Sequence, residues 1–259
     1  MAVYFKIMKI LVTNDDGIHH PGLCTLREEL ARSHDVTVVA PDRERSAVGH
    51  GITLHVPLRV FSVDHGKTPA FAVTGTPADC VKLGLLELVD PKPDLVVSGI
   101  NPGPNVGVNL NYSGTVSAAR EAAILGYRAV AISVSDPDST HFLAAARFVN
   151  RLIGRLTAFD IPKNTFLNVN VPARPPEKIL GVKICRQGLA RLEEAFHRRT
   201  DPRNLVYYWQ GSETLFYGES DDEDGVALAA GYITITPVRC DMTEYNLLDR
   251  MKDWDLWPE

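Results

Sequence analysis

Two adjacent carboxylates follow the first short apolar run of the chain. Residues 10–13 are Ile-Leu-Val-Thr, and Asn14, Asp15, Asp16 and Gly17 come directly after them. Such a run is typical of a strand buried on both faces of a parallel sheet, and open parallel sheets bind ligands outside the carboxyl ends of their strands. A simple turn would need one Asp rather than two. Neighbouring carboxylates repel each other, so the pattern favours a divalent cation with oxygen ligands, such as Mg²⁺, Mn²⁺ or Ca²⁺.

Two more polar segments follow other predicted strands. Ser46 ends the charged segment 41–46 and offers a neutral oxygen, although a charged loop is more often only solvated. Asn101 comes directly after the strand predicted at 94–99, in a segment rich in glycine and proline that also contains Asn105. The Asn101 amide can complete the shell of a hard metal or contact a phosphate oxygen. A turn that needs glycine and asparagine explains the same segment equally well.

Ser113, Gly114 and Thr115 lead into an alanine-rich helix predicted over 114–126. Free backbone amides and hydroxyls at the positive end of a helix dipole bind anions, phosphate above all. The segment is not a Walker loop, because no Gly-Lys-Ser/Thr follows, and a serine N-cap is the alternative. Beside the aspartates, it favours metal-assisted hydrolysis of a phosphate ester. Glu121, on the same helix, is expected to brace the loop.

Strands and helices alternate through the first two thirds of the chain. This alternation predicts an α/β fold with a doubly wound, mainly parallel sheet and helices on both faces. Strands are predicted at 9–14, 36–41, 70–75, 94–99, 129–134 and 166–171, with an extended ribbon at 53–63, and helices at 22–33, 77–89, 114–126 and 140–157. In such a fold the polar segments after the strands meet at one edge of the sheet.

The alternation of predicted strands and helices ends at the proline-rich segment after residue 172. We predict an α/β core domain over 1–172, which carries the site, and an antiparallel C-terminal arm with a helix over 173–259, which mediates oligomerisation. Extended segments are expected at 178–186, 204–210 and 232–238, with a polar stretch at 187–203 between them.

Two features of the arm lead to separate expectations. The acidic segment 219–225 is expected to be solvated surface, because its spacing does not fit a calcium loop. A last helix is predicted over 241–254, with Asp241 as N-cap and Glu244 at capping-box spacing.

Composition excludes several functions. The formal net charge is −5 and no long basic run occurs, which disfavours binding of long nucleic acid. No apolar stretch approaches the ~20 residues of a membrane helix, and the N-terminal residues lack a signal-peptide pattern, so a cytoplasmic protein is expected. The cysteines Cys24, Cys80, Cys185 and Cys240 form no C-x-x-C pair and are expected to be reduced thiols rather than zinc ligands.

Taken together, these motifs resemble those of the SurE family of metal-dependent 5′/3′-nucleotidases. The set is specific and runs in family order over nearly the whole chain, although each segment alone is not. The matching segments are Asn14–Gly17, Pro41–Ser46, Gly75–Cys80, Ser98–Asn101 with Gly103, Asn105 and Gly107, Ser113–Val116, Asn168–Pro172, Asp201–Arg203 and Gly231–Pro237. The chain departs from the commoner pattern at Ala47, Asn204 and Glu223, where glycine, glycine and threonine are frequent; the two later departures put substrate preference and assembly in doubt more than the reaction.

The resemblance implies hydrolysis of nucleoside 5′- and 3′-monophosphates to nucleoside and phosphate. It implies one Mg²⁺ or Mn²⁺ per subunit, and a homodimer or homotetramer with an exchanged C-terminal arm. The implied metal ligands are Asp15, Asp16, Ser46 and Asn101, with Asp15 and Asp16 catalytic; Asn101, Asn105, Ser113, Gly114 and Thr115 are expected to bind phosphate or substrate. Direct attack by water is favoured over an aspartyl-phosphate, because the D-x-D signature is absent.

Two rival functions stay open at this point. A non-catalytic nucleotide-binding or sensor protein could use the same crevice and would bind nucleotide without releasing phosphate. A nucleotide-sugar transferase also binds nucleotides at strand ends, but the compact Ser-Gly-Thr pocket argues against so bulky a donor.

Overall fold

The computed structural model describes residues 7–136, 141–156, 159–189, 191–216, 218–254 and 256–257. The chain folds around one nine-stranded sheet with the order β3-β4-β2-β1-β5-β6-β7-β11-β8. Its strands are β1 (Lys9–Thr13), β2 (Asp35–Pro41), β3 (Val60–Ser62), β4 (Ala70–Val73), β5 (Leu95–Pro102), β6 (Arg128–Val134), β7 (Thr165–Val171), β8 (Val182–Ile184) and β11 (Ile233–Arg239). The helices packed against it are α1 (Pro21–Leu30), α2 (Pro77–Leu83), α3 (Gly114–Ile124), α4 (Phe142–Leu156) and α5 (Asp224–Ala230).

The centre of the sheet is parallel. Strand β1 pairs with β2 on one side and with β5 on the other, and β6 and β7 continue in the same direction. Only the pairs β3–β4 and β7–β11 of this sheet are antiparallel. The predicted doubly wound, mainly parallel α/β fold is confirmed, and each of its predicted strands is present within three residues at either end.

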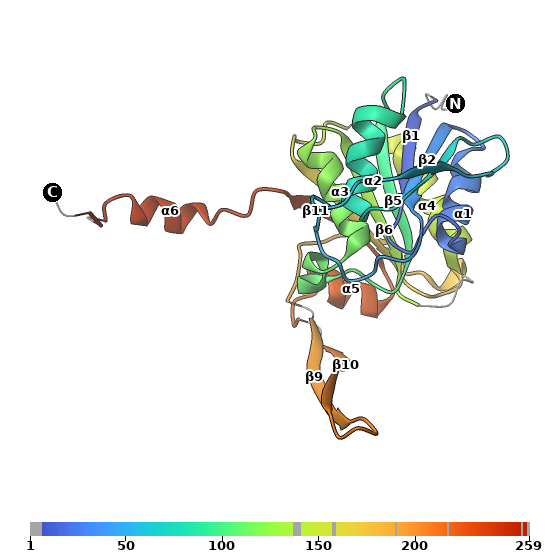
Figure 1. The fold of residues 1–259 in the computed structure, drawn as a ribbon. Coiled ribbons are helices and arrows are strands. Elements are labelled where there is room, and N and C mark those ends of the chain that lie inside the picture. Colours follow the sequence, from blue (N-terminus) through green and yellow to red (C-terminus); the bar gives the residue numbers. More distant parts are fainter. Residues whose placement is uncertain are drawn as a thin grey trace.

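Helices cover both faces of the sheet (Figure 1). On one face, α1 and α4 pack over Ile10 and Val97; on the other, α2 and α3 pack over Leu11 and Val96. This double covering explains the near-continuous apolar runs of the central strands. It leaves the loops after β2, β1 and β5 side by side at the carboxyl edge, because these three strands are neighbours.

The predicted ribbon at 53–63 is mostly irregular, and only β3 forms within it, at the edge of the sheet. Helix α2 is shorter than expected and continues as one π-helical turn, Gly84–Leu88. All four cysteines are free, as predicted; Cys80 and Cys185 are buried, and Cys24 and Cys240 are partly exposed.

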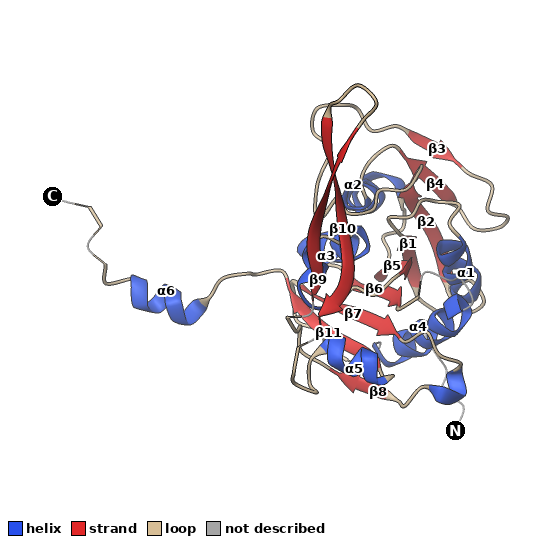
Figure 2. Ribbon diagram, turned by 90° about the horizontal axis from the view of Figure 1, so that it is seen from below, coloured by secondary structure: helices blue, strands red, loops and turns tan. Residues whose placement is uncertain are grey.

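The sequence-based interpretation of 187–203 as a polar connecting stretch was wrong. Strand β9 (Arg191–Thr200) lies within it and pairs with β10 (Val206–Phe216) in an antiparallel hairpin that projects from the body (Figures 1 and 2). The hairpin forms a separate two-stranded sheet. Its described side chains from Phe196 to Arg199 are all exposed, so β9 carries no alternation of apolar and polar residues that could have revealed it.

The acidic segment 219–225 is only partly solvated, which corrects the surface interpretation. Glu223 is 6% exposed, and Asp224, the first residue of α5, is completely buried. The last helix, α6 (Tyr245–Met251), begins later than predicted, because Glu244 rather than Asp241 caps it by accepting a hydrogen bond from the Asn246 N–H. Asp241 instead accepts from the Thr243 N–H.

Strands β8 and β11 both lie after residue 172, yet both belong to the nine-stranded sheet. The predicted domain boundary therefore does not coincide with the edge of the sheet. The parts that leave the body are the hairpin and α6, which extends on its own away from it (Figure 1). Within the described part of the chain, no helix combines the length and the apolar character needed to cross a membrane.

Candidate metal and phosphate site

The two aspartates lie in a tight turn at the end of β1. The Asn14 side chain shapes this turn from both sides, because its Nδ2 donates to the Gly17 carbonyl at 3.0 Å and its Oδ1 accepts from the Gly17 N–H at 3.3 Å. Gly17 has a φ of +103°, which disfavours any residue with a side chain. Asp15 is 3% exposed, and the Asp16 side chain is 10% exposed.

Helix α3 begins directly against Asp15. The Thr115 hydroxyl donates to Asp15 Oδ1 in a short hydrogen bond. A Cβ on Gly114 would lie 2.6 Å from the Asp15 Cβ, so only glycine permits this approach. Ser113 caps the helix by accepting from the Val116 N–H at 3.1 Å. The structure thus brings the predicted phosphate segment and the first aspartate into direct contact.

Burial is the main influence on the pKa of both aspartates. It raises the pKa of Asp15, against hydrogen bonds from Thr115 that lower it. For Asp16, burial and the charges of Asp15 and Glu44 raise the pKa to about 7. The nearest imidazole, His20, has its Nδ1 3.8 Å from Asp16 Oδ2, but burial lowers the His20 pKa and so favours its neutral form.

The Asp16 carboxylate also has an unpartnered oxygen. Its Oδ2 is buried and accepts no hydrogen bond from any described group. A buried carboxylate oxygen without a donor is costly, and a divalent cation relieves both this cost and the repulsion from Asp15. Within the described chain, no three His, Cys, Asp or Glu side chains cluster as metal ligands. The predicted set fits a hard cation nonetheless, since it combines two carboxylates with a hydroxyl and an amide.

The loop after β2, which contains Ser46, is hydrogen-bonded to the turn that contains the aspartates. The Arg45 N–H donates to the Asp15 carbonyl at 2.7 Å. Ser46 is exposed, and its hydroxyl donates to Glu44 Oε1 at 2.8 Å. Ala47 has a φ of +57°, a left-handed conformation that costs a residue with a side chain about 1–2 kcal/mol. This backbone would explain a glycine at the position, as the resemblance leads one to expect.

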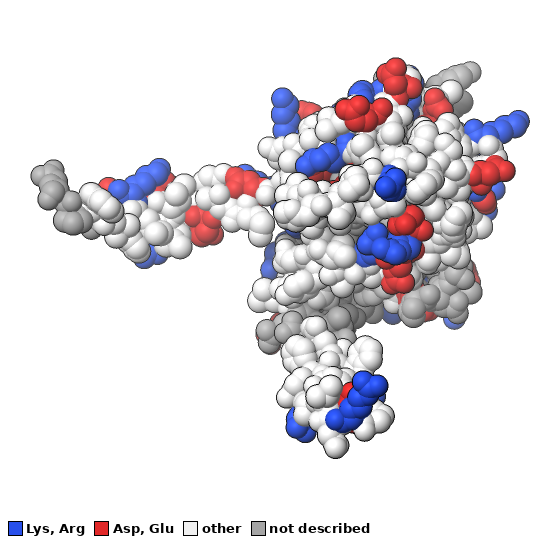
Figure 3. Space-filling view, viewed as in Figure 1, with Lys and Arg blue, Asp and Glu red and all other residues white. Residues whose placement is uncertain are grey.

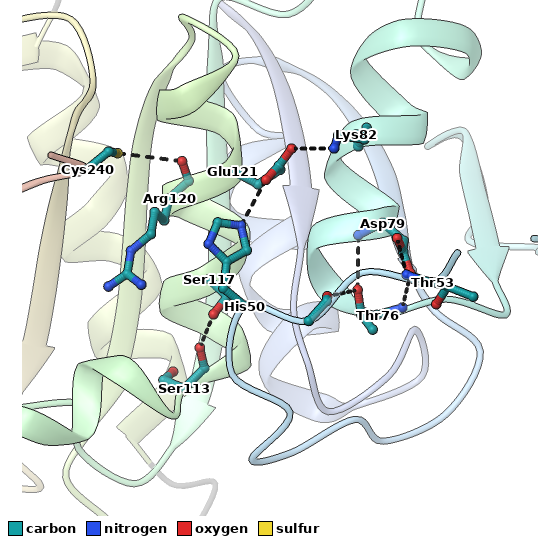
Figure 4. A network of polar contacts seen from close by, with 11 residues as sticks. His50, Thr53, Thr76, Asp79, Lys82, Ser113, Ser117, Arg120, Glu121 and Cys240 are labelled. Atoms are coloured by element: carbon teal, nitrogen blue, oxygen red, sulfur yellow. Dashed lines mark hydrogen bonds and ion pairs between the residues drawn. The ribbon is translucent and has the colours of Figure 1, made fainter. Parts of the chain in front are cut away.

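The same loop is anchored further on by polar contacts with α2 and α3 (Figure 4). His50 Nε2 lies 2.8 Å from Glu121 Oε2, and Lys82 Nζ lies 3.2 Å from Glu121 Oε1. The hydrogen bond from His50 is the main cause that lowers the pKa of Glu121. Thr53 and Thr76 add anchors, because the Thr53 N–H donates to the Asp79 carboxylate and the Thr76 hydroxyl donates to the Gly51 carbonyl. Glu121 therefore braces the loop that contains Ser46; no pattern in the sequence pointed to His50 as its partner.

Asn101 lies near the end of β5, next to β1 in the sheet. Its Nδ2 donates to the Gly103 carbonyl at 2.7 Å, and no described group donates to its Oδ1. No hydrogen bond in the described chain joins Asn101 or Ser46 to either aspartate. A shared cation would have to link them.

Asn105 is 7% exposed and tied into the neighbouring strands. Its Nδ2 donates to the Ser133 hydroxyl at 2.9 Å, and its backbone N–H donates to Asn170 Oδ1 at 2.8 Å. The side chains of Asn168 and Asn170 both donate to its carbonyl. Asn105 therefore fixes the glycine-rich segment against β6 and β7, and its predicted contact with substrate stays a prediction.

Comparison with known proteins agrees with this geometry. Residues 10–194 match the family model described as survival protein SurE. The 5′-nucleotidase SurE of Desulfatibacillum aliphaticivorans is 67% identical over 95% of this chain and 98% of its own length, and that of Syntrophobacter fumaroxidans is 48% identical over 96% and 100%. The crystal structure of the SurE protein from Aquifex aeolicus superposes with a TM-score of 0.83 at 38% identity, covering 94% of this chain and 98% of that one. The chain therefore belongs to the SurE family.

Proposed function

We propose that this protein is a metal-dependent phosphomonoesterase that hydrolyses nucleoside 5′- and 3′-monophosphates to nucleoside and phosphate. The observation that carries the proposal is the contact between Asp15, Gly114 and Thr115, which joins a buried pair of carboxylates to the positive end of α3. A phosphate bound at that helix end would lie beside the aspartates. The name 5′-nucleotidase SurE, which many similar proteins carry, supports the same reaction.

The residues suited to hold Mg²⁺ or Mn²⁺, one per subunit, are Asp15, Asp16, Ser46 and Asn101. They come from the ends of β2, β1 and β5, which are neighbours in the sheet, and Asp16 Oδ2 accepts no hydrogen bond from any described group. When bound, a divalent cation polarises the phosphoryl group and lowers the pKa of water.

The remaining steps fall to residues of the chain. The N-terminus of α3, entered through Ser113, orients the phosphate oxygens, and Asn101 closes the opposite side. Water attacks phosphorus in line, the bond from phosphorus to the ester oxygen breaks, and the nucleoside leaves. The attacking water gives up its proton to Asp15 or Asp16, the carboxylates beside the site, and the leaving ester oxygen takes up a proton.

The test is phosphate release by the pure protein with Mn²⁺ and a panel of phosphomonoesters. We expect turnover of nucleoside monophosphates. We also expect Asp15→Asn to lose activity and Mn²⁺ affinity together while the fold survives. Tight nucleotide binding without phosphate release would favour the sensor alternative, and an active Asp15→Asn enzyme with full metal content would refute the assignment.

We further infer that the protein assembles into a homodimer or homotetramer by exchanging its C-terminal arm. Basic side chains gather near the tip of the hairpin in the view of Figure 3, and Tyr208 and Trp209 are each 60% exposed. Helix α6 buries none of its residues, and Trp257 beyond it is 86% exposed. A two-stranded hairpin and a seven-residue helix are marginal alone.

Light scattering on the full chain and on a chain ending at residue 240 tests this assembly. The full chain should have the mass of a dimer or tetramer, and the truncated chain should form an assembly with fewer subunits. A monomeric full chain, or an unchanged mass after truncation, would contradict the exchange.

A further inference from the structure

Asp224 makes contacts that the proposed reaction has not yet used. Its carboxylate is fully buried and accepts hydrogen bonds from three backbone N–H groups. Oδ1 accepts from Gly225 at 2.8 Å and from Gly188 at 3.0 Å, while the Gly107 N–H is shared between Oδ2 at 3.0 Å and Oδ1 at 3.2 Å. Gly225 is its neighbour in α5, but Gly188 and Gly107 come from two distant parts of the chain.

Gly107 is held on both sides of its backbone. While Asp224 accepts from its N–H, Gln187 donates from Nε2 to its carbonyl at 2.8 Å. Gly107 has a φ of +58°, so the chain reverses here in a conformation that glycine adopts most easily. The position of this one residue is therefore fixed by a carboxylate and an amide that belong to the same region of the fold.

That region is the root of the projecting hairpin. Gln187 and Gly188 come shortly before β9, and Asp224 comes shortly after β10. Arg186 ties the two sides of the root together, because its guanidinium contacts Glu223 Oε1 at 2.7 Å and its backbone carbonyl accepts from the Asp224 N–H at 3.0 Å.

Gly107 in turn lies midway along the chain between Asn101 and Ser113. The segment 102–112 is the only covalent connection between the predicted metal ligand at the end of β5 and the phosphate helix α3. Asn105 anchors its first half to β6 and β7. Gly107 anchors the start of its second half, the 3-10 helix Gly107–Asn111 that leads into α3.

We propose that Asp224 is a positioning residue for the reaction: it fastens Gly107, and with it the segment 102–112 between the metal ligand and the phosphate helix, to the root of the hairpin. The inference rests on the proposed function, since the segment matters only if Asn101 and Ser113 meet the phosphate. It also implies that the oligomerisation arm and the site share one buried anchor.

The substitution Asp224→Asn isolates the link to Gly107. An amide oxygen in the place of Oδ1 still accepts from Gly188 and Gly225. An NH₂ group in the place of Oδ2 meets the N–H of Gly107, donor against donor, which leaves Gly107 only its longer contact of 3.2 Å with Oδ1. We expect KM for a nucleoside monophosphate to rise about tenfold with a smaller change in kcat, because a displaced cradle weakens ground-state and transition-state binding alike. Amide hydrogen exchange over 103–110 should become at least tenfold faster.

Asp222→Asn is the matched control. It makes the same chemical change two residues earlier, at an exposed carboxylate that contacts Ser220 and Arg186 but not Gly107, and it should leave KM and exchange unchanged. If Asp224→Asn does not fold, Gln187→Met removes the other hydrogen bond to Gly107 and should also raise KM and speed exchange.

Wild-type KM and wild-type exchange in a folded Asp224→Asn protein, or equal effects in Asp222→Asn, would overturn the inference. Failure of the proposed function is distinguishable, because it appears as a wild-type protein that releases no phosphate. Hydrogen exchange and the affinity for inorganic phosphate need no turnover, so they still decide whether Asp224 holds the segment in place.

Discussion

Replacing Asp16 by asparagine should stabilise the metal-free protein while destroying its metal site. In the absence of a cation, burial and the negative charges of Asp15 and Glu44 disfavour the ionised form of Asp16. Asparagine has nearly the same shape and no charge. A residue that lowers the stability of the metal-free protein is expected where metal binding restores that stability. The sign of the change in stability therefore tests the role assigned to Asp16.

The magnitude follows from the pKa. It is 3.8 for an unperturbed Asp and about 7 for Asp16 in the folded protein. Between these values the unfolded chain has released the proton and the folded chain keeps it, so the free energy of unfolding falls by about 1.4 kcal/mol for each pH unit. The loss begins near pH 4 and is complete above pH 7, where it reaches at most about 4 kcal/mol. The Asp16 side chain is 10% exposed, so solvent screens this effect little.

The assay is urea unfolding with a chelator at pH 4, 6 and 8, with and without Mn²⁺. Without metal, Asp16→Asn should exceed wild type by as much as about 4 kcal/mol at pH 8 and match it near pH 4. Mn²⁺ should stabilise wild type strongly at pH 8 and the variant far less. The exposed Asp35→Asn, at the start of β2, is the control and should follow wild type at every pH. A variant less stable than metal-free wild type at pH 8 would refute the reasoning.

Three shorter predictions test other contacts. His50→Ala removes the side chain that pins the Ser46 loop to Glu121, so Mn²⁺ titrations should show weaker binding by about threefold to tenfold, with His50→Gln closer to wild type. Gly114→Ala places a Cβ 2.6 Å from that of Asp15, so α3 must shift, and kcat/KM should fall at least tenfold; an unchanged value would contradict the close approach. Ala47→Gly relieves a left-handed alanine, so thermal unfolding should show a stability change between zero and a gain of about 1 kcal/mol, and a clear loss would contradict it.

The sequence was most informative where burial is complete. Central strands such as β1 and β5 contain buried apolar runs, Ile10–Val12 and Leu95–Val97, because helices cover both faces, and glycine or aspartate follows these strands where the chain must turn. The motifs at the ends of β1 and before α3 could therefore be located on one edge of the sheet in advance, and the contact between Asp15 and Thr115 agrees with that expectation.

Features that depend on long-range contacts were not predictable in the same way. Strand β9 has exposed side chains where the structure describes them, so no periodic pattern marks it. In the sequence, Asp224 is one of several acidic residues in a polar segment. Its hydrogen bond to Gly107 joins residues far apart in the chain, so no local pattern indicates it. The hydrogen bond between His50 and Glu121 joins an irregular loop to a helix, and no pattern in the sequence around either residue predicts this pair.

The most direct test of the central claim is anomalous diffraction from crystals grown with Mn²⁺. The account predicts one strong peak per subunit at the end of β1, within coordination distance of the carboxylates of Asp15 and Asp16, with Ser46 and Asn101 turned toward it. No peak beside the two aspartates, or a strong peak only elsewhere in the protein, would contradict it.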